Sequence, residues 1–408
     1  MEPNNQQYPA AEMERMMKVQ EVILKAVGGR LKWWEAAEIL GITDRTMRRW
    51  RERMEKWGYE GLYDRRKKRP SPKRVPLATV EKVLKLYQEK YFDFNVRHFH
   101  EKLEKEEGIR LSYTWVKLAL QGAGLVRKQK RRGPHRRRRP RRQLPGMLLH
   151  MDGSRHAWFQ DERYYDLLTI LDDATSEIYY AQLVEEESTR TVMAALREVV
   201  ERKGLFCALY SDRGSHFFVT PQAGEKVDPH RLTQVGRALK ELGIKMIAAY
   251  SPQARGREER SFRTWQGRLP QELRLRGIRS LEAANEFLRR EYKAEFNRRF
   301  AVPAEGKGDA FLRCARRDLD WVFSIQQERT VKGDNTVVVD NRILQIDKTP
   351  WRHTLAGCTV LVHELLDGTV ALRFGPHVVA RFEPHALPAP AAARLGRPRP
   401  LGHRRKVA

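Results

Sequence analysis

The chain has 408 residues and carries 79 Lys and Arg against 52 Asp and Glu, so its formal net charge of +27 points to a polyanion, DNA or RNA, as partner. No apolar run is long enough to cross a bilayer, and the three widely spaced cysteines lack the pattern of zinc ligands or of a disulfide framework. A soluble, reduced intracellular protein of two to four units is therefore expected. A ribosome-associated protein, or one whose charge serves only solubility, is the alternative to a DNA or RNA partner.

Residues 1–70 predict a helix-turn-helix domain. Apolar residues recur at helical spacing from 13 to 27, a short helix follows in WWEAAEILG, and Gly41 and Thr43 suit a turn and the N-cap of a third helix. That helix would expose Arg45, Arg48 and Arg49, whose guanidinium groups suit phosphates and guanine edges. A plain helical hairpin with a solvated basic face is the alternative, and the order of the elements favours DNA binding.

Residues 75–126 predict a second, weaker helix-turn-helix pattern with Ser112 as an N-cap, and an architectural helical domain is nearly as good an interpretation. A basic linker follows at 127–143, where RKQKRRGPHRRRRPRR has 11 Lys or Arg in 16 positions, too many like charges for a packed core. We expect this linker to lie along a phosphate backbone rather than to serve only solubility. Its predicted DNA contacts are Arg136, Arg137, Arg138 and Arg139.

Residues 144–300 predict a mixed α/β sheet flanked by helices. Three strands with tight turns are expected in MLLHMDGSRHAWF, YYDLLTILDDAT and SEIYYAQLV, and a helix-strand-helix-strand-helix alternation follows from Ser188. A further helix is expected at 280–299. The rest predicts a helical connector at 301–330 with a helix at 309–327, a small β-barrel at 331–386 and a disordered basic tail at 387–408.

Two carboxylates occupy unusual positions. Asp152 lies inside the first predicted strand of this sheet, and Asp212 ends a buried strand, LFCALYSD. An unpaired buried carboxylate is costly, so each needs a cation, a hydrogen-bond network or a metal. A salt bridge would explain Asp152 alone, and a loop cap would explain Asp212 alone. A third acid, Glu258 or Glu259, opens the following helix, and converging carboxylates are what two-metal phosphoryl transfer requires.

These motifs resemble those of the DDE transposases of bacterial insertion sequences, of the ISNCY type, which are distantly similar to retroviral integrases. The resemblance runs from WWEAAEILGITDRTMRRW through LLHMDGS, LYSDRGSHF and SPQARGREER to EFNRRFAVPAEGKGDAF. It implies a ribonuclease H-like core with Asp152, Asp212 and Glu259 as catalytic metal ligands. The implied metal is a pair of Mg²⁺ ions, which Mn²⁺ can replace.

The resemblance also implies a reaction and its partners. Water cuts the transposon ends, and the freed 3′ hydroxyl then attacks target DNA. The partners would be double-stranded DNA, both ends and target, and a homodimer or larger assembly in the cytoplasm, associated with the nucleoid. Arg257 and Arg260, beside the third acid, are the further predicted DNA contacts.

The third acid has an alternative at the neighbouring position. Relatives commonly have an apolar residue at position 258 and Asn at 262, where this chain has Glu258 and Phe262. At 100° per residue, Glu258 falls within an apolar stripe, whereas Glu259 lies about 75° from its centre, on the flank where a ligand could face DNA. Two functional alternatives stay open as well: a transposase-derived DNA-binding regulator without catalysis, and a ribonuclease H-like repair nuclease.

Overall fold

The computed structural model describes residues 10–62, 75–128, 139–220, 225–228, 230–250 and 256–387. The chain divides into two compact units, Met1–Leu86 and Tyr87–Ala408. Arg136, Arg137 and Arg138 and the predicted tail from residue 388 onward lie outside the described residues. Within the described part of the chain, no helix has the length and apolar character needed to span a bilayer.

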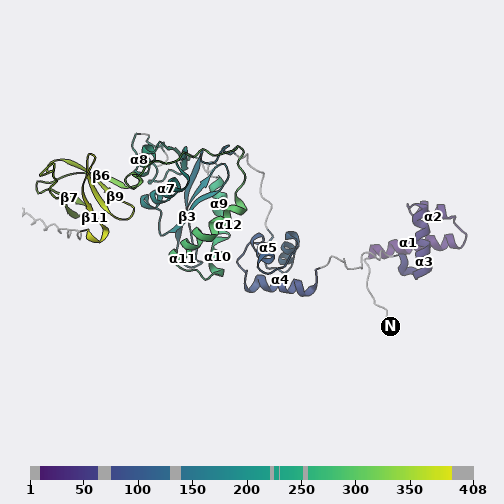
Figure 1. Ribbon diagram of the computed structural model, residues 1–408. Helices are drawn as coiled ribbons and strands as arrows, with labels where there is room; N and C mark the ends of the chain where they lie inside the picture. The colour runs from purple at the N-terminus through teal and green to yellow at the C-terminus, as the bar shows by residue number, and fades with distance from the viewer. Residues whose placement is uncertain are drawn as a thin grey trace, which may run out of the picture. The chain divides into compact units, whose positions relative to one another are not determined.

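The first unit contains the predicted helix-turn-helix. Its helices are α1 (Ala10–Val27), α2 (Trp33–Ile39) and α3 (Asp44–Trp57), followed by a short 3-10 turn at Gly58–Leu62 (Figure 1). Gly41 has a φ of +64°, which favours glycine, and the Thr43 hydroxyl caps α3 by accepting from the Thr46 amide at 3.3 Å. Met47 on α3 packs against apolar residues of α1 and α2, so the opposite face of α3 is left to its arginines.

A second helical set precedes the sheet. It comprises α4 (Leu77–Glu89), α5 (Val96–Lys105) and α6 (Tyr113–Gly122), and the Ser112 hydroxyl caps α6 as predicted. Buried ion pairs tie α5 to the body of the second unit. The Glu272 carboxylate accepts from Lys102 at 2.8 Å and contacts His98 Nε2 at 2.7 Å.

The centre of the second unit is a five-stranded mixed sheet in the order β3-β2-β1-β4-β5. The strands are β1 (Leu149–His156), β2 (Tyr165–Asp172), β3 (Ile178–Val184), β4 (Ala208–Ser211) and β5 (Lys245–Ala248). The first three are antiparallel, and β4 and β5 run parallel to β1. This arrangement confirms the predicted mixed sheet and makes β1 and β4, the strands of the two aspartates, direct neighbours.

Helices cover both faces of this sheet (Figure 1). On one face, α7 (Thr189–Lys203) and α8 (Gln234–Glu241) pack over Leu149 and Met151. On the other lie α9 (Gly256–Gln266), α10 (Leu269–Leu275), α11 (Leu281–Phe287) and α12 (Lys293–Phe300), the last two joined by a π turn at Leu288–Tyr292. The predicted helix at 280–299 therefore forms with a single irregular turn.

The segment after residue 300 differs from its prediction. The helix expected at 309–327 is wrong, since only Leu319–Val322 is helical, as α13. Leu312 instead forms a backbone bridge with Leu205, with N–O distances of 2.7 and 2.8 Å, which holds this stretch extended against the core. From residue 325 onward the chain is already part of the C-terminal sheet.

The C-terminal strands do not close into the predicted barrel among the described residues. A four-stranded sheet has the order β11-β10-β9-β6, and a separate hairpin pairs β7 with β8. The strands are β6 (Ile325–Thr330), β7 (Thr336–Val339), β8 (Arg342–Gln345), β9 (Thr359–Glu364), β10 (Val370–Phe374) and β11 (His377–Phe382), followed by a 3-10 turn at Pro384–Ala386. Because β7 and β8 bond only to each other, the ladder is not continuous around the module.

Candidate active site

Asp152 lies on the face of β1 that α9 covers. Successive side chains of a strand alternate between its faces, and Leu149 and Met151 enter the core beneath α7 and α8. His150, Asp152 and Ser154 therefore project from the opposite face. Asp152 is half-buried, and its Oδ1 accepts from the Gly153 amide at 3.0 Å.

The register of β1 and β4 relates Asp152 to Asp212. Leu149 pairs with Leu209 and His150 with Tyr210, in parallel, so paired positions are 60 residues apart. Asp152 and Asp212 are also 60 residues apart, two steps further along the same ladder. Paired residues of parallel strands project from the same face, and the strands are about 4.8 Å apart. If this register continued two residues beyond its last observed pair, Asp212, the first residue beyond β4, would lie beside Asp152.

Asp212 also shapes the loop that follows β4. Its Oδ1 accepts from the Gly214 amide at 2.8 Å, and a Cβ added at Gly214 would approach that same oxygen to 2.9 Å. The loop-capping role weighed for this residue is therefore real. A carboxylate has two oxygens with about four acceptor sites, so a cap does not exhaust its capacity to bind a cation.

Helix α9 runs along β1 on the same face as Asp152. His150 Nδ1 lies 3.1 Å from Glu258 Oε1, and Gln266 donates to the Ser154 hydroxyl at 3.0 Å. From Glu258 to Gln266, eight residues of α9 rise about 12 Å. From His150 to Ser154, four residues of β1 rise about 13 Å, so the two elements advance by nearly the same distance. Phe262, midway between the two helix contacts, then lies at the level of Asp152.

The two candidate glutamates have different surroundings. Glu258 is only 3% exposed and directed at His150, whereas Glu259 is exposed. Arg257 contacts the Asp173 carboxylate, beyond the end of β2. At 100° per residue, Glu259 projects about 200° around the helix from Arg257, away from Asp173. Since β2 and β4 flank β1 on opposite sides, this direction leads toward the β4 side.

A buried charged cluster lies under the start of α9. The Asp173 carboxylate, fully buried, accepts from Arg139, from Arg257 and, at 2.8 Å, from the Arg142 amide, and its Oδ1 is 2.7 Å from His150 Nε2. Burial lowers the pKa of His150, but the hydrogen bonds to Asp173 and Glu258 outweigh it and raise that pKa overall. Burial raises the pKa of Asp173, but the hydrogen bonds from His150 and Arg142 and the charge of Arg257 hold it well below its usual range.

The cluster also anchors the end of the basic linker. Besides the contacts of Arg139 and Arg142, Arg141 donates to the carbonyl of Asp173 at 2.9 Å and to the Ser176 hydroxyl at 2.8 Å. Arg257 donates to the Arg139 carbonyl at 2.7 Å. One buried carboxylate thus joins the linker to the helix that carries the third candidate acid.

The predicted DNA contacts occupy different environments. Arg45, Arg48 and Arg49 are exposed on α3, and Arg260 is exposed on α9. Arg139 and Arg257 are turned toward Asp173, with side-chain exposures of 41% and 18%. The first four are therefore open to a ligand, while the last two already serve the fold.

The described residues contain no group of three or more His, Cys, Asp and Glu positioned to hold a metal ion. Two of the three predicted ligands have the chemistry that a hard cation requires. Asp152 lies on β1 and Asp212 directly after the neighbouring strand β4, and Mg²⁺ prefers carboxylate oxygens such as theirs. The described residues thus do not bring Asp152, Asp212 and Glu259 together as a metal-ligand set.

Sequence reasoning did not identify the cluster of His150, Asp173 and Glu258. One signal was present, because His150 precedes Asp152 by two residues and so shares its face of the strand. The Asp173 partnership had none, since it depends on how β1 and β2 pair. His216, near Asp212 in sequence, contacts the Thr189 hydroxyl at 3.3 Å at the start of α7.

Comparisons with known proteins find two family models and two transposases that match this chain. A homeodomain-like family model matches residues 46–120, and a helix-turn-helix domain model matches residues 20–71. Over 367 residues the chain is 32% identical to y4bF, a Sinorhizobium fredii protein named as a transposase, covering 89% of this chain and 80% of y4bF. It is 29% identical to the transposase for insertion sequence IS1202 of Streptococcus pneumoniae, covering 68% of this chain and 67% of that one.

Solved structures with some likeness come from retroviruses. The integrase catalytic core domain of HTLV-2, solved in complex with magnesium, matches 36% of this chain and 90% of its own at 16% identity, with a TM-score of 0.28. A simian T-cell lymphotropic virus intasome in complex with PP2A regulatory subunit B56 gamma matches 76% of this chain at 12% identity and covers 100% of its own matched chain, with a TM-score of 0.31.

Proposed function

The chain belongs to the transposase family of bacterial insertion sequences, and we propose that it cuts the ends of its element and joins them to target DNA by metal-dependent phosphoryl transfer. The family follows from the 32% identity that extends over four fifths of y4bF. The proposal's main support is the pairing of β1 with β4, whose register, continued as far as Asp212, would bring that residue beside Asp152.

We assign Glu259, rather than Glu258, as the third acid. Glu258 is buried and bound to His150, so its carboxylate serves to hold α9 on β1. Glu259 is exposed one residue later, on the side of the helix turned away from Asp173. A ligand shared with a DNA phosphate must be accessible to DNA, and only Glu259 meets that condition.

The chain's own residues divide the chemical work. Asp152, Asp212 and Glu259 would hold the metal, with the first two positioned by strand register and the third by the His150–Glu258 contact. A pair of Mg²⁺ ions, or Mn²⁺ in their place, when bound supplies an activated hydroxyl nucleophile and neutralises charge on the phosphate. Arg260, exposed one residue beyond Glu259, would contact the DNA backbone beside the reacting bond.

The N-terminal helices supply recognition in this proposal. Arg45, Arg48 and Arg49 are exposed on α3, the second helix of the helix-turn-helix pair, where a recognition helix carries its groove contacts. We infer that they recognise the terminal repeats, while Arg136, Arg137 and Arg138 follow the phosphate backbone and Arg139 anchors the end of that linker to Asp173. Because two ends must be joined together, the active form is expected to be a homodimer or larger.

The test uses DNA carrying the inverted repeats that flank the gene. Wild type should cut these ends in Mg²⁺ and join them to a second duplex, while Asp152→Asn and Asp212→Asn should each lower both steps at least 100-fold and still bind the repeats. Cutting by both variants would refute the site assignment. Binding without any cutting by wild type would support the regulator, and cutting without joining would support the repair nuclease.

A further inference from the structure

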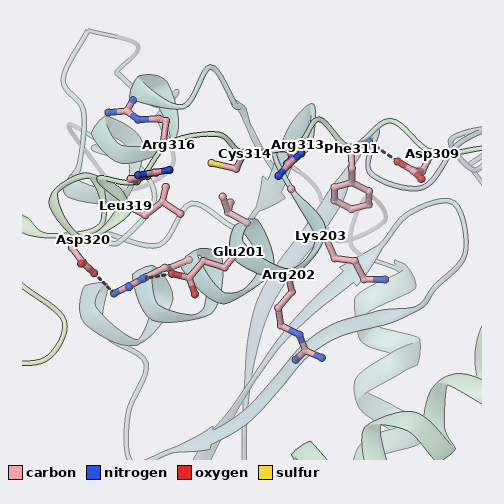
Figure 2. A pocket seen from close by; sticks show the side chains of 14 residues that line it. Glu201, Arg202, Lys203, Asp309, Phe311, Arg313, Cys314, Arg316, Leu319 and Asp320 are labelled. Carbon is pink, nitrogen blue, oxygen red and sulfur yellow. Dashed lines mark hydrogen bonds and ion pairs between the residues drawn. The ribbon is translucent and has the colours of Figure 1, made fainter.

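A basic hollow lies on the face of the core that α7 covers. Its volume is about 540 Å³, and it opens between the second half of α7 and the connector at residues 309–320. Figure 2 shows Phe311, Arg313 and Arg316 of the connector along one side and Glu201, Arg202 and Lys203 of α7 along the other. Six of its lining residues are Lys or Arg against three acids, so the hollow carries positive charge.

The connector side of the hollow is held firmly by the core. The Leu205–Leu312 bridge fixes its backbone through two hydrogen bonds. Gly204 makes this close approach possible: its φ is +106°, and a Cβ there would lie 2.5 Å from the Leu312 carbonyl oxygen. The backbone that leads into Arg313 is therefore already ordered, so binding of a ligand would not have to order it.

The acids of the hollow already have partners. Glu201 and Asp320 both pair with Arg197, at 2.7 and 2.6 Å, and Asp309 accepts from the Phe311 amide at 3.0 Å. Arg316 is likewise engaged, with Asp318 at 2.7 Å and Glu241 at 2.9 Å.

Two arginines of the connector remain without such a partner. Arg313 and Arg317 are exposed, and neither forms an ion pair with any residue that the structure describes. Their charge is not neutralised within that part of the molecule. An anion in the hollow could therefore pair with these two guanidinium groups.

We propose that this hollow binds the phosphate backbone of duplex DNA through Arg313 and Arg317, without regard to sequence. Guanidinium groups match phosphate oxygens in charge and geometry, and an open, charged surface of this kind suits a backbone better than a small apolar ligand. The inference rests on the proposed function, because a transposase must hold both its element's ends and a target.

The place of the hollow defines what kind of contact it makes. Gly204 lies before β4 and Asp212 directly after it, so the hollow and the candidate acids lie toward opposite ends of that strand. Four strand residues span about 13 Å. The phosphates held here are therefore not the ones that react, and the contact positions DNA rather than taking part in the chemistry.

The test is the double variant Arg313→Glu/Arg317→Glu in the full chain. Its matched control is Arg279→Glu/Arg298→Glu, which makes the same charge change at two exposed positions beside the helices of the opposite sheet face. Affinity for a duplex with the terminal repeats and for an unrelated duplex is measured between 50 and 200 mM salt. We expect the hollow variant to lose about tenfold on both duplexes and to lower the salt slope by about 1.8, the value for two phosphates.

Each outcome decides the proposal. Loss of affinity for one duplex alone would contradict binding without regard to sequence, and would assign the hollow to the element's ends or to the target instead. Unchanged affinity, or an equal loss in the control, would overturn the proposal. A changed sedimentation coefficient with unchanged DNA affinity would instead indicate a protein contact. If the wild type did not cut the ends, the proposed function would be wrong, but the binding results for the hollow would remain valid.

Discussion

His150 and Glu258 meet inside the protein, with 3.1 Å between the ring Nδ1 and the carboxylate Oε1. The contact joins strand β1, two residues before Asp152, to helix α9, one residue before Glu259. It fixes the helix that carries the third candidate acid with respect to the strand that carries the first. The two adjacent glutamates thereby acquire separate roles, one in holding the helix and one in the proposed chemistry.

Substitution of the two glutamates should therefore have opposite effects on end cutting and on stability. Glu259→Gln should abolish end cutting, by at least 100-fold, and change the free energy of unfolding by less than about 0.5 kcal/mol, because the side chain is exposed. Glu258→Gln should cost about 1–3 kcal/mol of stability, since it removes a charged partner of a buried histidine, yet the folded protein should retain cutting, because the glutamine amide can still hydrogen-bond His150 and hold α9 on β1. Urea unfolding and an end-cutting assay measure the pair, and full activity of Glu259→Gln would refute the assignment.

Loss of Asp173 should disturb both stability and cutting. Asp173→Asn removes the charge shared by His150, Arg139 and Arg257, and breaking such a buried pair costs about 3–5 kcal/mol. Because Arg257 opens α9, we expect end cutting to fall about tenfold even below the temperature at which the variant unfolds.

A matched control separates these two effects. Glu272 is equally buried and equally paired, with His98, Lys102 and Arg276, but it joins α10 to α5 rather than to the proposed site. Glu272→Gln should lose comparable stability and keep the cutting rate of its folded fraction. Equal loss of cutting in both variants would show that Asp173 acts through stability alone.

The C-terminal sheet should weaken in mild acid. Burial, reinforced by the nearby charges of Arg373 and Arg237, lowers the pKa of His363 from 6.5 to about 4. The unfolded chain then binds a proton more readily than the folded one between these values, so stability is full above pH 6.5 and falls as pH drops toward 4. The loss is about 3 kcal/mol at most.

The variant His363→Phe removes this titration. The urea midpoints of wild type and variant are measured at pH 7 and at pH 4.5. Between these pH values the midpoint of the wild type should fall more than the midpoint of the variant. Loss of the 2.8 Å contact between His363 Nδ1 and the Ser324 hydroxyl affects both pH values alike. A difference that does not change with pH would contradict the expected protonation.

The arginines of α3 should set affinity for the terminal repeats. Arg48→Ala/Arg49→Ala should weaken binding to repeat DNA by about 10- to 100-fold, since a base contact is worth about 1–3 kcal/mol, and weaken binding to unrelated DNA much less. Arg15→Ala on α1, another exposed arginine, serves as control. A uniform loss on both DNAs would indicate phosphate contacts instead of sequence recognition.

Much of the core was predictable because its sequence signals are local. The alternation of apolar residues, the Ser and Thr caps and the glycine stops each act within a few residues, and the strands and helices from β1 to α9 follow them. Asp152 and Asp212 were conspicuous as acids in apolar surroundings. That β1 and β4 are neighbouring strands, by contrast, depends on long-range pairing, which no local signal contains.

The failures have a common physical cause in long-range contacts. The stretch from 309 to 327 has helical spacing, but the bridge between Leu312 and Leu205, 107 residues away in sequence, holds it extended. The pairing of His150 with Asp173 and Glu258 likewise joins three separate segments. At such positions tertiary contacts override the propensity of the chain.

The parallel register also constrains how this protein can change over generations. Loops outside the strands tolerate added length at small entropic cost. A single residue inserted within Ala208–Ser211 is different, because a one-residue slip turns every following side chain to the other face. Asp212 would then project from the face opposite to that of Asp152. Related elements can therefore differ in the length of their loops, but the number of residues in this strand has to stay the same.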